Sequence, residues 1–456
     1  MTAATAAAAL GASVVLVESG RLGGEALHAA VPSKALLAAA RHVRAMSGAQ
    51  AFGVRVARPK IDFMAVQDHL QEVMAGLAPN VSKERLAGQG IRVIDGVARF
   101  LDRQTVAVEE AFTIRARHVI IATGSSPALP SIPGLADAPY LTTGTIFDLR
   151  VCPRHLLVIG ANAVALELAQ AFRRLGADVT VIATTQVLAK DDPECVDVVL
   201  RGLRRDGVVI RTGMMPLEVR RTRGKVQVVL QNDEMVEGSH LLIAAGRTPN
   251  VGDLGLEHAR IEYDATGILV DHQMRSSNKQ VSAIGDVVGG GPSGQAAACQ
   301  ADVAVRSVLL QQPVKAGASV IPHVVFTDPE FAQVGLTEEE ARVRRRRIRV
   351  LRWPFRETDR AHAERDTAGH IKVVTDRKGT VLGAAIVGSH ASELINVWTL
   401  AVANRLNIRA MADVTVPYLT FGEAGRRAAL GALTMKLTPP LLRRIVELIR
   451  WPSRPA

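Results

Sequence analysis

Two glycine-bearing stretches predict an α/β protein with two Rossmann-like domains and a smaller C-terminal α+β domain. In the first, an apolar run ends at Glu18, and Gly23, Gly24 and a Pro-Ser-Lys segment ending at Lys34 follow it. In the second, a β-branched run leads into Gly160 and an apolar helix. Glycines let the backbone pass close to a nucleotide, and an acid at a strand end can accept hydrogen bonds from a ribose.

The first domain is predicted over residues 1–150 and begins with a helix. Residues 2–10 have a helical composition, and residues 13–17 are then the second strand of a βαβ unit, with Glu18 as the ribose acid. Such a unit ordinarily starts with a strand and a glycine loop, roughly 15 residues in all, which this sequence lacks. We therefore expect a coding start upstream of Met1, although a domain truly without its pyrophosphate loop is the alternative.

Further elements of this domain follow in order. Helices are predicted over residues 32–46 and 63–86, and strands over residues 92–98, 107–108, 112–115 and 119–121. The last strand leads into Ala-Thr-Gly, where Thr123 and Gly124 are expected to form a tight turn against a bound nucleotide.

The second domain is predicted over residues 151–270. A strand, a helix and a strand carry the pattern Gly-x-Gly-x-x-Gly as Gly160, Asn162 and Ala165. Alanine is an accepted variant at the third place, whereas Asn162 puts a side chain where a pyrophosphate should approach. Nucleotide binding is favoured over a bare βα unit. The second strand ends in Ala-Thr-Thr, so the sequence does not distinguish NADH from NADPH.

Two further strand ends, and the α+β pattern that follows them, divide the remainder of the chain. A strand at residues 241–244 runs into Gly246 and Arg247, and another ends at Gly285 and Asp286. Residues 271–318 are expected to return to the first domain. Strands and helices over residues 319–430 indicate the α+β domain.

These motifs, in this order, resemble the pyridine nucleotide–disulfide oxidoreductases, the family of dihydrolipoamide dehydrogenase and mercuric reductase. That family has Gly-Gly-Thr-Cys-x-x-x-x-Cys-x-Pro-Ser-Lys at its flavin site, and the two cysteines form a redox disulfide. This chain has Ala26 and Ala30 nearest those places, with one residue fewer in the segment. The resemblance therefore implies the fold and the cofactors, FAD and NAD(P)H, without the disulfide.

The resemblance also assigns roles to particular residues. It implies that Lys34 and Glu167 pair beside the flavin N5, that Asp286 faces the ribityl chain, and that the C-terminal domain joins two subunits in a homodimer. In the family that domain lends a His-Glu pair to the partner subunit's active site. Here Glu423 matches the glutamate, but Tyr418 stands where the histidine is expected.

The resulting functional hypothesis is an FAD-dependent NAD(P)H oxidoreductase, with a diaphorase-like hydride transfer and a non-disulfide electron acceptor. A non-catalytic FAD- and NAD-binding relative, acting as a sensor or interaction protein, is the alternative, and a poorly folding product of a decayed gene is a third reading. Yellow colour in the purified protein, and its bleaching by a nicotinamide, separate the three.

The composition of the chain limits the kinds of binding partner that we expect. The chain has 456 residues and a formal net charge of +11, but aromatic residues make up only 4%, so no base-stacking platform and no nucleic-acid partner is expected. Cys152, Cys195 and Cys299 lack metal-site spacing and suit a reducing cytoplasm. Residues 431–456 form a basic tail whose residues 441–451 suit an amphipathic helix, which either contacts an acidic membrane surface or partner, or packs on the protein itself.

Overall fold

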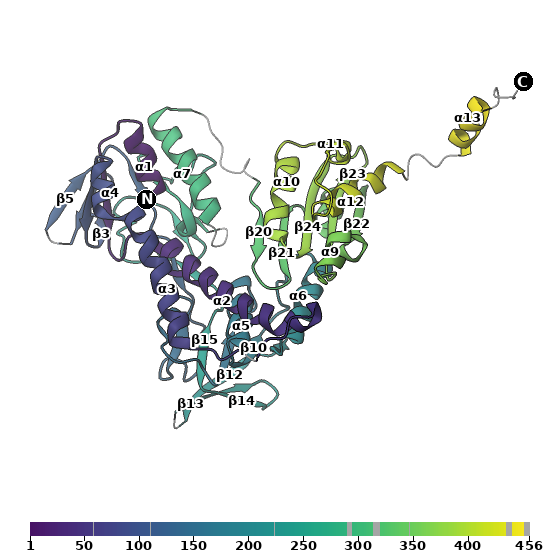
Figure 1. The fold of residues 1–456 in the computed structure, drawn as a ribbon. Helices are drawn as coiled ribbons and strands as arrows, with labels where there is room; N and C mark the ends of the chain where they lie inside the picture. The colour runs from purple at the N-terminus through teal and green to yellow at the C-terminus, as the bar shows by residue number, and fades with distance from the viewer. Residues whose placement is uncertain are drawn as a thin grey trace, which may run out of the picture. The chain divides into compact units, whose positions relative to one another are not determined.

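The computed structural model describes residues 1–434 and 440–450, except residues 58, 110, 223, 290–293, 313–319 and 346. The chain forms two units (Figure 1). The N-terminal unit comprises Met1–Val187 and Asp206–Ser319, and the C-terminal unit comprises Leu188–Arg205 and Val320–Ala456. The predicted mixed α/β fold class is observed, whereas the finer division at residues 150, 270, 318 and 430 stays a prediction.

A parallel five-stranded sheet forms the middle of the N-terminal unit, in the order β11–β10–β9–β15–β8. Its strands are β8 (Tyr140–Thr142), β9 (His155–Ile159), β10 (Asp178–Ala183), β11 (Val209–Thr212) and β15 (His240–Ile243). β9 and β10 are buried along almost their whole length, as expected of parallel strands covered on both faces. Helix α5 (Ala163–Arg174) follows β9 and packs on the sheet.

A second group of elements belongs to the same unit. β1 (Val14–Glu18) pairs in parallel with β2 (Ile91–Asp95), and β6 (Val119–Ile121) pairs with β19 (Val281–Ala283). Helix α1 (Thr2–Ala9) packs on α7 (Gly294–Leu309), as Figure 1 shows. Residues far apart in the sequence therefore share this part of the fold.

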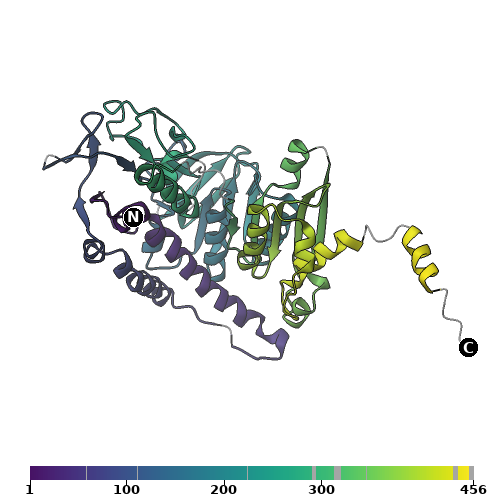
Figure 2. The same cartoon turned by 90° about the horizontal axis from the view of Figure 1, so that it is seen from above.

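The helices differ from the sequence prediction in one place. Helix α2 (Val31–Gly48), the long purple helix of Figure 2, lies where it was expected. The single helix predicted over residues 63–86 is wrong, because the structure has α3 (Phe63–Leu77), the 3₁₀ turn η3 (Ala78–Val81) and α4 (Lys83–Gly88). Pro79 interrupts the helical hydrogen bonds, and the Ser82 side chain then caps α4.

Smaller elements complete the N-terminal unit. They are η1 (Ala26–Ala30), η2 (Ala49–Phe52), β3 (Ala98–Phe100), β4 (Thr105–Val108), β5 (Phe112–Arg115), β7 (Ser125–Pro127), η4 (Ile146–Asp148), β12 (Pro216–Thr222), β13 (Lys225–Leu230), β14 (Met235–Gly238), β16 (Arg247–Pro249), β17 (Tyr263–Asp264), β18 (Gly267–Ile268) and η5 (Gly285–Val288). The strand predicted over residues 92–98 is thus divided between β2 and β3.

The C-terminal unit is built on an antiparallel five-stranded sheet in the order β20–β21–β24–β23–β22. Its strands are β20 (His323–Val325), β21 (Glu330–Gly335), β22 (Ile348–Pro354), β23 (His370–Asp376) and β24 (Val381–Gly388). The helices are α6 (Pro193–Arg205), α8 (Glu338–Arg344), α9 (Asp359–Ala363), α10 (Ala391–Ala403), α11 (Ile408–Asp413), α12 (Glu423–Thr434) and α13 (Pro440–Arg450), with the 3₁₀ turn η6 (Phe355–Glu357). α10 packs on β21 and β24, α12 packs on β22 and β23, and α6 also contacts β21 and β24.

A buried ion cluster joins three elements of this unit. The Lys372 side chain on β23 is 3% exposed, and its Nζ lies 2.7 Å from Asp192, 2.8 Å from Glu194 and 2.9 Å from Glu338. Burial opposes the charge on Lys372, but its hydrogen bonds to the three carboxylates raise its pKa well above the usual range. A bidentate hydrogen bond from Arg352 lowers the pKa of Glu194 to about 2, with Lys372 adding to the effect.

In the described part of the chain, no helix has both the length and the apolar composition that crossing a bilayer requires.

Candidate functional site

The structure brings Lys34 and Glu167 together. Lys34 lies in the first turn of α2 and Glu167 lies in α5, and Nζ donates a hydrogen bond to Oε2 at 2.7 Å. α2 packs along α5, so the contact between the two helices sets this distance. The Glu167 side chain is 3% exposed and that of Lys34 is 40% exposed. The result is an ammonium group that solvent or a ligand can reach, anchored by a buried carboxylate.

The segment before Lys34 has no thiol. Ala26–Ala30 forms one turn of π-helix, η1, and the ring of His28 contacts the carbonyl of Leu22 at 3.0 Å. All three cysteines are free. Burial raises the pKa of Cys152 and raises that of Cys195 further, which disfavours the thiolate form that disulfide exchange needs.

Two of the predicted motifs form one paired structure. β7, which follows Thr123 and Gly124, is antiparallel to β16, which contains Arg247. The Thr123 hydroxyl donates to the Asn250 carbonyl at 2.8 Å, and the Asn250 amide donates to the Thr123 carbonyl at 2.9 Å. The Ala-Thr-Gly turn and the Gly-Arg-Thr-Pro-Asn segment are therefore fixed relative to each other by backbone and side-chain hydrogen bonds.

A third motif joins them through Ser125. Arg247 Nε donates to the Ser125 hydroxyl at 2.7 Å, and that hydroxyl donates to Asp286 Oδ2 at 2.6 Å. Arg247 also lies 3.7 Å from Asp286 and 3.4 Å from Glu25. The side chains of Arg247 and Asp286 are only 17% and 14% exposed. Lys34, Glu167, Arg247 and Asp286 were predicted as site residues, whereas Ser125 and Glu25 were missed.

The position of each missed residue, directly after a recognised motif, could have indicated it. Ser125 directly follows the Thr-Gly turn, and Glu25 directly follows Gly23-Gly24. The family that this chain resembles has threonine after its Gly-Gly pair, whereas this chain has the acidic residue Glu25 there. Burial raises the pKa of Glu25 and the Asp286 charge acts in the same direction, while Arg247 opposes the rise.

Gly160, Asn162 and Ala165 lie at the N-terminal end of α5. A Cβ on Gly160 would stand 2.2 Å from the Ala244 carbonyl oxygen, so the approach of β9 to residue 244 requires glycine. Asn162 Oδ1 accepts a hydrogen bond from the Ala165 amide, and Nδ2 donates to Ala244 at 2.8 Å. Both ends of the Asn162 side chain thus bond to the protein, and the expectation that it stands where a pyrophosphate should approach stays a prediction.

The backbone conformations of three glycines suit the close approach of a cofactor. Gly24, Gly124 and Gly246 all have positive φ, and no neighbouring heavy atom lies within 4 Å of the place a Cβ would take. Their backbones are therefore accessible to a ligand in conformations that other residues rarely adopt. Gly23, by contrast, packs tightly on Leu27, and the Gly285 amide donates to Gln300 Oε1 at 2.7 Å. FAD fits this combination of accessible backbone and the half-buried Asp286 carboxylate.

Glu18 and Glu423 are the other two predicted site residues. Glu18 ends β1, and its Oε1 accepts a hydrogen bond from the Gly20 amide at 2.9 Å. Glu423 is the first residue of α12 in the C-terminal unit, and its buried Oε2 has no hydrogen-bond partner among the described residues. Tyr418 is 70% exposed, and its hydroxyl donates to Asp359. Tyr418 therefore does not form a pair with Glu423 here.

No group of three or more His, Cys, Asp and Glu side chains in the described ranges is arranged to hold a metal ion.

Comparison with known proteins identifies the family of the chain. Residues 1–307 match the family described as pyridine nucleotide-disulphide oxidoreductase, and residues 321–429 match its dimerisation domain, which supports a homodimer. Among curated proteins, the chain is 33% identical to a mercuric reductase of Streptomyces lividans over 438 residues, which is 94% of this chain and 92% of that protein. It is 31% identical to a dihydrolipoyl dehydrogenase of Staphylococcus aureus over 442 residues, 94% of each chain.

Solved structures give the same result. LpdA from Mycobacterium tuberculosis has a TM-score of 0.87 and 27% identity, covering 94% of this chain and 97% of that one. The HOCl-induced flavoprotein disulfide reductase RclA from Escherichia coli, solved as a Cu(II) complex, has a TM-score of 0.85 and 25% identity, covering 93% and 96%. The predicted family and cofactors are confirmed: the chain belongs to the pyridine nucleotide-disulphide oxidoreductase family, whose members are FAD-dependent oxidoreductases that use NAD(P)H.

Proposed function

We propose that this protein is a flavin-dependent NAD(P)H oxidoreductase that passes electrons to an acceptor other than a disulfide. One observation carries the proposal. The Lys34–Glu167 pair is present at 2.7 Å, while alanines occupy the places nearest the family's two cysteines. The pair that the resemblance assigns to hydride transfer is thus present, and the cysteines that serve thiol transfer in the family are absent from these places.

The chain's own residues supply binding and electrostatics. FAD, when bound, would supply the redox chemistry by accepting a hydride from C4 of the nicotinamide at its N5 atom. Lys34 would place a positive charge beside that atom, and buried Glu167 would hold the ammonium in position. Asp286, fixed by Ser125 and Arg247, would accept hydrogen bonds from the flavin side chain. The N-terminal end of α5 would bind the nicotinamide nucleotide through its amides and dipole.

A single experiment separates this function from disulfide reduction. FAD-loaded protein is given NADH or NADPH with a quinone or dye in one reaction, and with lipoamide, glutathione disulfide or Hg(II) in others. We expect turnover with the quinone or dye and none with the other three. A variant with Cys152→Ser, Cys195→Ala and Cys299→Ser is expected to keep the dye activity, since no thiol takes part. Rapid lipoamide or Hg(II) reduction by the parent protein would overturn the proposal.

A second function has a specific observation in its favour. Tyr418 replaces the histidine that the family pairs with its glutamate, and Glu423 has a buried carboxylate oxygen without a described partner. A protein that has lost this pair could bind FAD and a nicotinamide without catalysis, as a sensor or interaction protein. Bleaching of the bound flavin by NADH or NADPH distinguishes the two, because the sensor alternative predicts binding of the nicotinamide with no bleaching.

The C-terminal tail adds a proposed membrane contact. Four apolar side chains of α13 are 43–73% exposed, namely those of Ile445, Val446, Leu448 and Ile449. Arg444 and Glu447 are charged neighbours on the same helix, and the tail, residues 431–456, has five basic residues against one acid. Such a helix suits the headgroup plane of an anionic membrane. Trp451, the last residue of the expected amphipathic helix, lies outside the described residues.

A further inference from the structure

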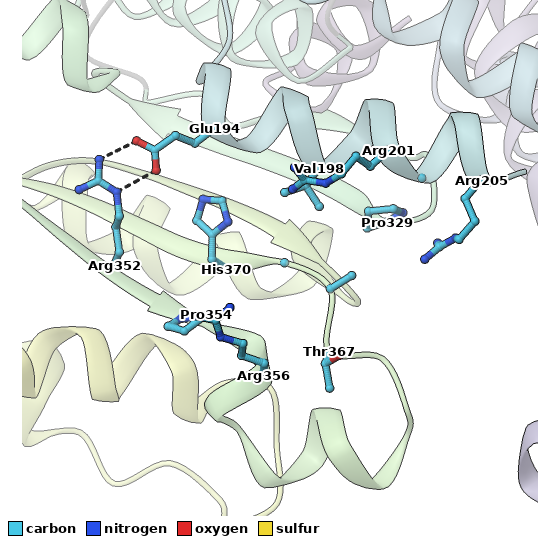
Figure 3. Close-up of a pocket in the computed structure, with 13 residues that line it drawn as sticks. Glu194, Val198, Arg201, Arg205, Pro329, Arg352, Pro354, Arg356, Thr367 and His370 are labelled. Atoms are coloured by element: carbon cyan, nitrogen blue, oxygen red, sulfur yellow. Dashed lines mark hydrogen bonds and ion pairs between the residues drawn. The ribbon is translucent and has the colours of Figure 1, made fainter. Parts of the chain in front are cut away.

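A cavity of about 650 Å³ lies wholly within the C-terminal unit (Figure 3). Its walls come from α6, the end of β22, η6 and the start of β23. Arg201 and Arg205 line it from α6, and Arg352 and Arg356 line it from the other wall. This volume falls in the range of about 300–1,000 Å³ that is typical of small-molecule sites. No residue of the proposed flavin site contributes to it.

The charges that line the cavity are not balanced. Its lining includes four arginines and one carboxylate, that of Glu194. Arg352 is matched by a bidentate hydrogen bond to Glu194, and Arg201 is matched by Asp197 on its own helix. Neither Arg205 nor Arg356 forms an ion pair with a described carboxylate. Arg205 and Arg356 therefore remain as the two guanidinium groups most available to a ligand, one on each wall.

Two neighbouring groups bear on this balance. Asp366 offsets part of the Arg205 charge through space, although no ion pair joins the two side chains in the described part of the chain. His370 faces the cavity, and burial lowers its pKa although Glu194 opposes the shift, so the ring is neutral near pH 7. His370 thus offers a hydrogen bond rather than a third charge.

The lining of the cavity favours a ligand that has both an anionic group and an apolar part. Val198, Pro329 and Pro354 supply apolar surface between the arginines. A Cβ on Gly202 would stand 2.6 Å from Pro329 Cδ, so α6 and the turn before β21 are in close contact and this wall is firmly packed. The planar guanidinium group matches the oxygens of a phosphate with two parallel hydrogen bonds.

We propose that this cavity binds a phosphorylated small molecule, with Arg205 and Arg356 contacting its phosphate oxygens from opposite walls. The apolar surface would receive the organic part of the ligand. This second site is independent of the proposed oxidoreductase activity, because all of its lining residues belong to the C-terminal unit. It therefore adds a phosphate-binding site apart from those proposed for FAD and the nicotinamide nucleotide.

Inorganic pyrophosphate is the probe for the test, titrated calorimetrically into FAD-loaded protein that is saturated with NAD⁺. We expect saturable binding that weakens about tenfold or more in the double variant Arg205→Gln/Arg356→Gln, since two charge-assisted contacts are lost. The control is Arg204→Gln/Arg409→Gln, which removes the same charge from exposed positions outside the cavity and is expected to bind like the parent.

Three results would overturn the proposal. They are the absence of saturable binding, binding that Arg205→Gln/Arg356→Gln leaves unchanged, and equal weakening in the control variant. The last would show that overall charge attracts the probe, and the second would place it at another site. Circular dichroism of both double variants establishes that they are folded, so a loss of binding reports on the cavity.

Discussion

The ammonium nitrogen of Lys34 lies 2.7 Å from Oε2 of Glu167, although the two residues are 133 positions apart in the chain. The carboxylate is buried and the ammonium is half exposed, so the pair fixes a positive charge at the edge of the protein interior. A charge held in this way can act on a bound redox group without first reorganising solvent.

Removing either partner should slow the reduction of bound flavin. We expect Lys34→Ala and Glu167→Gln to lower the rate of flavin bleaching by NADH or NADPH by about 10- to 100-fold, because one oriented charge is lost. Flavin content should stay unchanged. Stopped-flow absorbance under anaerobic conditions measures the rate. Lys83→Ala, which removes an exposed lysine paired with Asp95, is the control, and unchanged rates in both site variants would argue against the assignment.

Asp286 should govern the retention of flavin rather than its reduction. The carboxylate is 14% exposed and held by Ser125 and Arg247, so Asp286→Asn removes a fixed acceptor and leaves Arg247 with a weaker partner. We expect FAD affinity to fall about tenfold or more, from the loss of a charge-assisted hydrogen bond. The ratio of flavin to protein after dialysis measures it. Asp264→Asn, at an exposed turn, should retain flavin like the parent.

The Lys372 cluster should make stability depend on pH in the acid range. Glu194 has its pKa lowered to about 2, below its unfolded value of 4.5, chiefly by Arg352. A carboxyl of this kind contributes stability above the unfolded pKa and loses it as the pH falls through the folded pKa. The free energy of unfolding should therefore decrease between about pH 4.5 and pH 2.

Lys372→Met tests the same cluster directly. The variant leaves three carboxylates around a buried position, so we expect a loss of about 3–5 kcal/mol in the free energy of unfolding at pH 7. The decrease with acid should also become shallower, since the carboxyls lose a cause of their lowered pKa. Denaturant titrations at several pH values measure both effects. Lys225→Met, at an exposed pair with Glu237, should change little, and a stable Lys372→Met protein would contradict the account.

The tail is expected to bind anionic vesicles. Each basic residue near such a surface contributes about 1 kcal/mol, so binding should be reversible and should weaken with added salt. Co-sedimentation with phosphatidylserine-containing liposomes compares the full chain with one ending at residue 430, and neutral liposomes serve as the control. If the two proteins sediment equally, the apolar side of α13 instead packs on the protein.

The sequence predicted the elements in which one physical signal dominates. β9, α5 and β10 were recognised because buried parallel strands have continuous apolar runs and Gly160 marks the turn between strand and helix. Lys34 and Glu167 were paired only through the family resemblance, since nothing in either helix alone indicates the other. Pro79 was a local signal for the break between α3 and α4, and the helical pattern around it concealed that signal.

Other features depend on contacts that the sequence does not encode locally. The chain of Arg247, Ser125 and Asp286 exists because β7 pairs with β16 in one register, and strand pairing between distant segments cannot be inferred from either strand. Residues 188–205 lie between two strands of the N-terminal sheet in sequence, yet belong to the C-terminal unit. The arginine-lined cavity follows from that placement and had no counterpart in the motif pattern.

We expect electrons to leave the flavin without passing through a protein disulfide, and counting electrons tests this expectation most directly. FAD-loaded protein is titrated anaerobically with NADH while the flavin absorbance is followed. A flavin that is the only redox centre accepts two electrons, so we predict complete bleaching at about one equivalent of NADH per flavin. Consumption of about two equivalents before bleaching is complete would reveal a second two-electron centre, as a redox disulfide provides, and would contradict the account.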